Sequence, residues 1–228
     1  MDVNLLSVIV APRKATARIA SRPSWVTSFL LLAAVSVALY VAAHPFALET
    51  TLAHLPKSAT AEEKNVIAQT LRNELVVNAL FLPIRLLVGW FAFAVALFGM
   101  TRTLVPPQPV HLVNVLSLEV HTECVNVLAY AATCLLMYTG VGETSGAVLA
   151  PLSVAMFADT NDPVLRTLLN AINPFTVWYL TVLTAGIRTQ SRLSRTNATL
   201  VVILTWLSSM LFTLGSVSFI RSQLHLNV

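Results

Sequence analysis

Charged residues are scarce in this chain of 228 residues, of which only 11% are Asp, Glu, Lys or Arg. Soluble domains average about 25%, and hydrophobic residues make up 56% of the chain. The scarcity leaves uncharged runs of 19–25 residues at 25–43, 124–142, 167–187 and 196–220. An α-helix needs roughly 17–25 residues to cross the hydrocarbon core of a bilayer. The composition therefore excludes an ordinary soluble domain and predicts a polytopic membrane protein.

Cysteine and the motifs of common enzymes are also nearly missing. The two cysteines, Cys124 and Cys134, lie ten residues apart in one predicted helix and face different directions, so they cannot bridge each other. The chain has neither a His-Glu-x-x-His zinc helix nor a phosphate-binding Gly loop followed by Lys and Ser or Thr. No face combines basic and aromatic residues as nucleic-acid binding requires. We therefore expect no catalytic residue, no cofactor and no nucleic-acid partner; whether a metal binds is unknown from sequence.

A fifth span comes from the shorter uncharged run 86–101, which reaches a spanning length if Arg85 snorkels to the headgroups. The predicted fold is thus an all-α polytopic membrane protein with five transmembrane helices, at about 25–43, 80–101, 115–142, 167–187 and 196–220. A basic leader, residues 1–24, precedes this single membrane domain of residues 25–228. In the leader, Val8, Ile9 and Ile19 are expected to rest in the membrane interface. His44-Pro45 is expected to end the first span.

Two amphipathic helices are predicted in the outer loops. The first, at about 61–78, has a capping box formed by Thr60 and Glu63 and should run on into the second span. The second, at about 163–172, has Asp162 as its cap and Pro163 at its first position. Asn173-Pro174 should break this helix before the fourth span.

The basic residues alternate between the gaps that separate the spans. Eight of the 14 lie in the leader and after the second and fourth spans: Arg13, Lys14, Arg18, Arg22, Arg102, Arg188, Arg192 and Arg195. Five lie on the opposite side, and Arg85 lies within a span. Because cytoplasmic loops carry an excess of Lys and Arg, we predict a cytoplasmic N-terminus and a C-terminus outside.

The strongest candidate site is the cluster of Glu119, His121 and Glu123 near the start of the third span. Glu119 and Glu123 are four residues apart and therefore lie on one helix face. Two carboxylates in a low dielectric cannot both stay ionised without a cation or another partner. Three interpretations stay open: an interfacial helix at residues 110–123 whose acids are in water, a structural ion pair, or a functional site for an ion or proton.

Four other polar residues are candidates for the same membrane region. Arg85 should either snorkel to the outer headgroups or reach inward toward Glu123. Asn126 extends the Glu119–Glu123 face, and Asn170 and Asn173 lie in the broken approach to the fourth span, where transporters often line a cavity. The competing interpretation is that Asn173 caps the helix that begins there.

Three sequence segments resemble those of a known family. They are Pro23-Ser24-Trp25 before the first span, Leu116-Ser117-Leu118-Glu119-Val120-His121 in the third, and Asn173-Pro174-Phe175-Thr176-Val177-Trp178-Tyr179-Leu180, with Gly186 further on, in the fourth. Together with the order of spans, they are similar to the bacterial branch of the Yip family, five-span membrane proteins named for Ypt/Rab GTPase interaction. Because the leader has only 24 residues, the Rab-binding role of eukaryotic members is not carried over.

The resemblance implies a multi-pass protein of the cell inner (plasma) membrane. We expect it to act without catalysis, through the lipid bilayer and through a membrane-protein partner or a second copy of the chain, in membrane organisation. The alternative is a small ion- or proton-coupled permease that uses Glu119 and Glu123, with Arg85 as the counter-charge. Trp178 and Tyr179 are interpreted as packing or interface residues.

Overall fold

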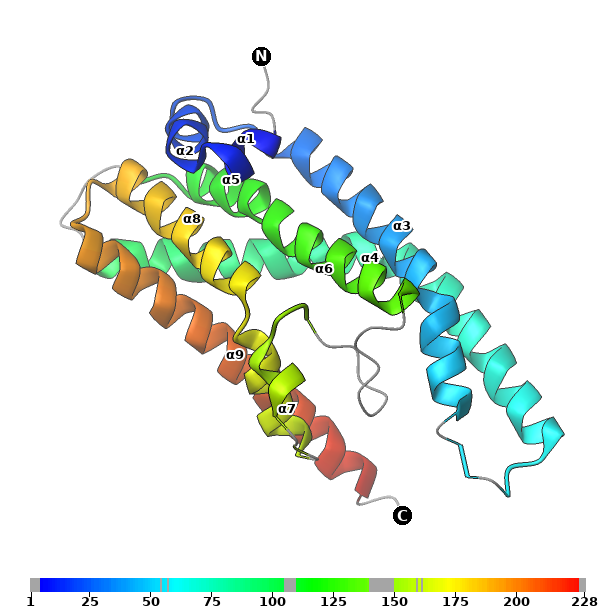
Figure 1. Cartoon of the computed structure of the whole chain (residues 1–228). Coiled ribbons are helices and arrows are strands. Elements are labelled where there is room, and N and C mark those ends of the chain that lie inside the picture. Colours follow the sequence, from blue (N-terminus) through cyan, green and yellow to red (C-terminus); the bar gives the residue numbers. More distant parts are fainter. Residues whose placement is uncertain are drawn as a thin grey trace. The chain divides into compact units, whose positions relative to one another are not determined.

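The structure is a computed structural model that describes residues 5–53, 55–56, 58–104, 110–139, 150–158, 160 and 162–225 (Figure 1). Packing divides the chain into two units, each built from segments far apart in the sequence. The first unit comprises Met1–Trp25, Trp90–Thr122 and Trp178–Val228. The second unit comprises Val26–Gly89 and Glu123–Val177.

The regular elements in the described part of the chain are all helices, as predicted. Four segments are long and apolar enough to cross a membrane: α3 (Val26–Ala53), α4 (Ala61–Leu104), Leu112–Tyr138, and the Arg195–Gly215 part of α9 (Arg195–His225). Leu112–Tyr138 consists of α5 (Leu112–Thr122) and α6 (Cys124–Tyr138), joined by Glu123 in helical conformation (φ −59°, ψ −17°). A bent pair, α7 (Pro163–Ala171) and α8 (Pro174–Ser191), is the fifth candidate span. The all-α membrane architecture is therefore confirmed.

In the first unit, the basic leader packs on the helix that begins the third predicted span. It forms α1 (Leu5–Val10) and α2 (Pro12–Ser21), and both pack on α5 (Figure 1). Val8, Ala15 and Ile19 have no exposed surface. Val8 and Ile19, which were expected to rest in the membrane interface, are instead covered by protein, because α5 offers an apolar face that covers the apolar side of α2.

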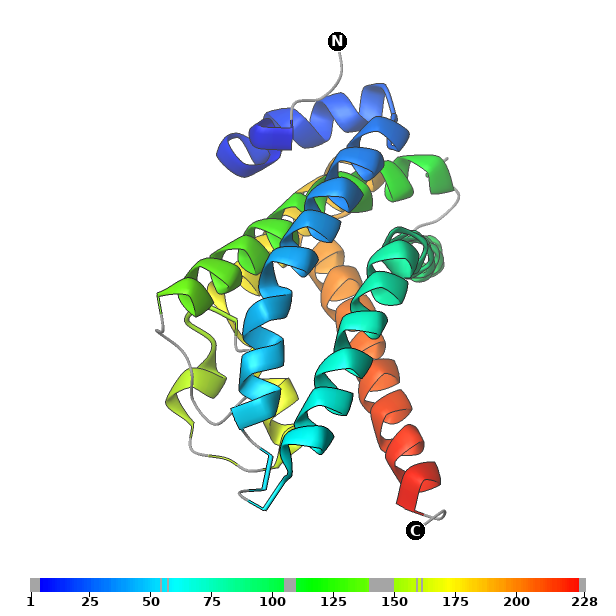
Figure 2. The same ribbon diagram turned by 90° about the vertical axis from the view of Figure 1, so that its right-hand side faces the viewer.

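In the second unit, α3 lies beside α6 in both views (Figures 1 and 2). The prediction that His44-Pro45 ends the first helix is wrong, since α3 continues past Pro45 to Ala53. Tertiary contacts hold the helix together there. The ring of Phe46 packs edge-on against Tyr138 at 4.4 Å between centroids, and the Tyr138 hydroxyl donates to the Ala42 carbonyl at 3.2 Å.

The two helices that the sequence predicts to begin near residues 61 and 163 do begin there. At the start of α4, the Thr60 N–H donates to the Glu63 carboxylate at 2.7 Å and the Glu63 N–H donates to the Thr60 hydroxyl at 3.2 Å. These bonds from the Thr60 backbone and hydroxyl lower the pKa of Glu63, which lies well before the predicted span. Asp162 caps α7 by accepting from Val164 N–H at 2.8 Å. A short 3₁₀ helix, η1 (Val154–Phe157), precedes α7.

Candidate functional site

Polar side chains of α5 are buried in the protein. Glu119 and His121 are each only 1% exposed, and Ser117 and Thr122 have no exposed surface. The interpretation of an interfacial helix with its acids in water is therefore wrong for Glu119. The reason is tertiary: α2 covers one side of α5, and side chains of α8 contact another. A carboxylate in such a position needs hydrogen-bond donors from the protein.

Glu119 receives a hydrogen bond from a residue that is 60 positions away in the sequence. The Tyr179 hydroxyl donates to Glu119 Oε1 at 2.7 Å. Tyr179, on α8, is 5% exposed, and its ring lies 6.2 Å from that of Phe93 between centroids. A hydrogen bond in a low-dielectric interior is electrostatically stronger than one in water. This bond therefore joins α5 to α8 inside the first unit.

His121 hydrogen-bonds along its own helix. Its Nδ1 lies 2.7 Å from the carbonyl oxygen of Ser117. Because a carbonyl oxygen only accepts, Nδ1 carries the proton in this arrangement, and in a neutral ring Nε2 is the acceptor nitrogen. The imidazole is thus held in one orientation by the backbone of α5.

Glu123 belongs to the second unit and has a partner there. It is 9% exposed, and its Oε2 accepts from the Asn126 side-chain amide at 3.1 Å. Asn126 therefore serves as a hydrogen-bond donor to a carboxylate one turn earlier. The predicted pair of carboxylates is divided: Glu119 is bound by Tyr179 in the first unit, and Glu123 by Asn126 in the second.

Arg85 does not reach inward. Its Nη1 donates to the Asn78 side-chain oxygen at 3.1 Å, two helical turns closer to the start of α4. The side chain is exposed and extends toward the start of α4, which is the direction that snorkelling out of the predicted second span requires. The structure therefore places Arg85 with Asn78 and not with Glu123.

The two asparagines before the fourth span hold the broken helix together. Asn173 Oδ1 accepts from the Thr176 N–H at 3.0 Å, which makes Asn173 the cap of α8. Its amide donates to the Asn170 carbonyl at 2.9 Å. The Asn170 side chain accepts from the Ala150 N–H at 2.7 Å. Both side chains therefore satisfy backbone groups around the break.

A close approach between α5 and α8 depends on a glycine. A Cβ added at Gly186 would lie 2.5 Å from Cδ2 and 2.9 Å from Cγ of Leu118, and closer still to Cδ1. Leu118 has no exposed surface. One turn further along α8, the Gln190 amide donates to the Asn114 carbonyl at 3.0 Å. Small residues permit this kind of helix contact in membranes.

One known protein family matches most of the chain. The profile of the Yip1 domain matches residues 6–217. The chain belongs to the Yip1 domain family. No curated protein and no solved structure matches the chain significantly.

In this Yip1 domain, two of the segments that carried the family resemblance meet in space. The segment that begins at Leu116 supplies Leu118 and Glu119, and the segment that begins at Asn173 supplies Tyr179, with Gly186 two turns later. The role of Tyr179 was missed from sequence, because helical periodicity does not identify a partner 60 residues away. The sequence had indicated Tyr179 only as a packing or interface residue, and the resemblance that included it gave no hydrogen-bond partner.

The buried polar groups do not form a metal centre of a familiar kind. Across the residues that the structure describes, no three His, Cys, Asp or Glu side chains are grouped so that they could hold a metal ion. The hydrogen bonds hold the carboxyl group of Glu119 and the imidazole of His121 in fixed orientations in the protein interior.

Proposed function

We propose that this member of the Yip1 domain family is an integral protein of the inner (plasma) membrane that organises its surroundings without catalysis. It would do so by gathering anionic lipid headgroups at its cytoplasmic side and by contact with a membrane-protein partner or a second copy. The observation that carries the proposal is the disposition of α2. Its apolar side is packed on α5, while its three cations and that of Arg22, directly after the helix, stay exposed.

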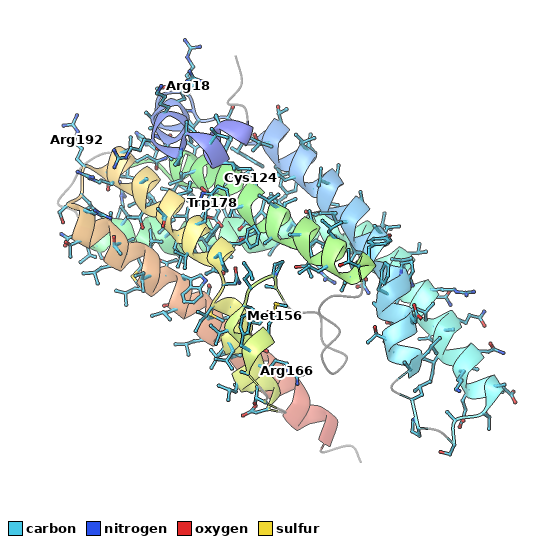
Figure 3. The ribbon with its side chains drawn as sticks, viewed as in Figure 1. Arg18, Cys124, Met156, Arg166, Trp178 and Arg192 are labelled. Carbon is cyan, nitrogen blue, oxygen red and sulfur yellow. The ribbon has the colours of Figure 1, made fainter. Side chains whose placement is uncertain are left out.

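The exposed cations of α2 are Arg13, Lys14 and Arg18, and Arg22, directly after the helix, is exposed too. Three more exposed cations lie at the end of α8 or after it: Arg188 in its last turn, and Arg192 and Arg195 beyond it. Figure 3 shows Arg18 and Arg192 extending away from the ribbon of the first unit. Each Lys or Arg near an anionic membrane surface contributes about 1 kcal/mol of attraction. A leader fixed to the protein presents its cations without the entropic cost of ordering a free tail.

The charge of the chain is divided between the two units. The first unit carries nine basic and two acidic residues, and the second carries five basic and eight acidic ones. The corresponding net charges are +7 and −3, and eight of the nine basic residues of the first unit lie in segments that the sequence predicts to be cytoplasmic. The same excess supports attraction to anionic lipids, which are abundant in cytoplasmic leaflets.

Neutralising the leader tests this proposal. In the variant Arg13→Gln, Lys14→Gln, Arg18→Gln and Arg22→Gln, we expect the enrichment of anionic over zwitterionic lipid around the reconstituted protein to fall several-fold. The measurement is the lipid composition that co-purifies from mixed bilayers, at low and high salt. A fraction of the chains should also insert with inverted topology, as a terminal reporter would show.

The matched control is Lys64→Gln with Arg72→Gln, two exposed cations of α4 on the opposite predicted side. This control should leave lipid enrichment and topology unchanged. If the leader variant retains both its lipid enrichment and its topology, the proposal is wrong.

One observation favours a second function, a small ion- or proton-coupled permease. Glu119 and Glu123 are both buried and belong to one candidate span, Leu112–Tyr138. Intramembrane carboxylates frequently mark ion or proton pathways. If this function holds, wild-type protein in liposomes should carry a proton or cation flux that Glu119→Gln/Glu123→Gln abolishes. Equal flux in both proteins, or none in either, would exclude it.

A further inference from the structure

The helix α7 has its apolar face turned outward. Val164, Leu165, Leu168 and Ile172 are 36–52% exposed, and at 100° per residue they occupy one side of the helix. In water, an amphipathic helix packs this face against the protein and leaves its polar face to the solvent. The orientation of α7 is therefore the reverse of what an aqueous loop would adopt.

Hydrogen bonds fix this orientation from the polar side of the helix. The Asn170 side chain accepts from the Ala150 N–H at 2.7 Å, and Arg166 Nη2 donates to the Thr160 carbonyl at 2.7 Å. The Val154 N–H donates to the Ile172 carbonyl at 3.0 Å and ties η1 to the end of α7. The polar side of α7 is consequently occupied by its own loop, and the helix cannot roll its apolar face inward without breaking these bonds.

The short helix η1 and the turn before it extend the same kind of surface. Phe157 is 79% exposed, Leu152 is 65% exposed and Val154 is 41% exposed. Figure 3 marks the two elements by Met156 on η1 and Arg166 on α7. Contiguous apolar side chains that remain exposed mark contact with an apolar partner or with a membrane.

The connection to α8 indicates that this exposed apolar surface contacts a membrane and not another protein. α8 has 18 residues, so at 1.5 Å per residue it is about 27 Å long, close to the roughly 30 Å of the hydrocarbon core. Its far end carries Arg188 and is followed by Arg192. Only Ile172 and Asn173 separate its start from α7, and the two helices are bent by 58°. α7 therefore begins its oblique course at the boundary of the hydrocarbon.

The exposed surface is also continuous with the span. Val177, one turn into α8, is 62% exposed and follows Ile172 by five residues. The only charged residues of the α7 segment are Asp162, at the capped end, and Arg166, on the polar side. This distribution matches a helix whose apolar face enters the acyl-chain boundary by about 5–10 Å while its polar side meets headgroups.

We propose that η1 and α7 form an interfacial membrane element whose exposed apolar side chains insert into the leaflet at which α8 begins. The occupant of this surface is the acyl chains of that leaflet. The proposal does not depend on the lipid-gathering function proposed for the basic residues of the first unit.

Site-directed spin labelling of the full-length protein in liposomes tests this placement. In a Cys124→Ala, Cys134→Ala background, nitroxides are placed through Phe157→Cys, Leu165→Cys and Leu168→Cys. Val88→Cys, on an exposed apolar position of α4 within the predicted second span, is the lipid control, and Glu62→Cys is the aqueous control. Collisions with oxygen and with a water-soluble nickel complex are measured at each site. We expect the oxygen-to-nickel ratio at the three test sites to lie near the lipid control and several-fold above the aqueous one.

Two results would overturn the proposal. A ratio at all three sites equal to that of Glu62→Cys would place the surface in water. Shielding from both reagents, with spin–spin broadening that disappears when the protein is diluted in lipid, would show that a second copy covers it.

A measurement on the unmodified chain keeps the proposal falsifiable if the labelled variants do not fold. A diazirine dissolved in the bilayer should, on photolysis, label peptides containing η1 and α7 as strongly as peptides from the Arg195–Gly215 part of α9. Labelling of the α9 peptides alone would contradict the insertion of η1 and α7.

Discussion

Replacing Gly186 with valine is expected to lower the free energy of unfolding of this Yip1 domain by about 1–3 kcal/mol, the cost of overpacking a filled interior. A Cβ at this position meets three atoms of the Leu118 side chain within 2.9 Å. Leu118 has no exposed surface, so its side chain cannot turn away without displacing neighbours. The measurement is denaturant titration of the protein in mixed micelles, followed by helical circular dichroism.

Gly99→Val is the matched control. Gly99 also lies within a long helix, and a Cβ there meets nothing within 4 Å. Valine has a higher helix propensity than glycine, so this control should be neutral or slightly stabilising. If Gly186→Val and Gly99→Val unfold alike, the close approach of α5 and α8 does not contribute to stability.

A substitution at Leu118 shows whether Gly186→Val acts through its contact with Leu118 or by destabilising α8 itself. Leu118→Ala alone should cost about 2–5 kcal/mol, because it leaves a cavity. In the double variant Gly186→Val/Leu118→Ala, the new methyl groups occupy part of that cavity. The double variant should therefore be more stable than the sum of the single effects predicts.

Features set by neighbouring residues could be predicted from the sequence. The starts of α4 and α7 follow from Thr60 with Glu63 and from Asp162 with Pro163, because capping bonds join residues two or three positions apart. Asn173 as the cap of α8 has the same origin. The apolar runs identified the candidate spans for a similar reason: length and composition are local properties.

Features set by tertiary packing could not be predicted in this way. Pro45 would end an isolated helix, yet α3 continues because Phe46 and Ala42 are held by Tyr138. The leader was expected in lipid, because sequence does not reveal that α5 provides a competing apolar surface.

In the candidate site, too, the sequence identified the unusual residues but not their distant partners. The residues Glu119, His121 and Glu123 were identified as unusual because charge within an apolar run is costly. Their hydrogen-bond partners could not all be identified in this way. Glu119 is bound by Tyr179 on a distant helix, and Arg85 contacts Asn78 rather than Glu123. A long-range pair of this kind requires the three-dimensional arrangement of α5 and α8.

Tyr179→Phe is expected to lower the free energy of unfolding by about 1–3 kcal/mol, the cost of removing the donor of a buried carboxyl oxygen. The substitution removes the hydroxyl that donates to Glu119 Oε1 at 2.7 Å and keeps the ring that packs near Phe93. Glu119→Leu should also be costly, because it leaves the Tyr179 hydroxyl buried without that acceptor. Denaturant titration of each variant gives the values.

The double variant Glu119→Leu/Tyr179→Phe decides whether the two residues act as a pair. Replacing both partners by apolar groups of similar shape is close to neutral when the pair is structural. The double variant should therefore be more stable than either single variant, with a coupling of about 1–3 kcal/mol. Tyr138→Phe is the control, since its hydroxyl makes a longer bond of 3.2 Å to a neutral carbonyl in an exposed position. If Tyr179→Phe costs no more than Tyr138→Phe, the bond to Glu119 does not hold α5 to α8.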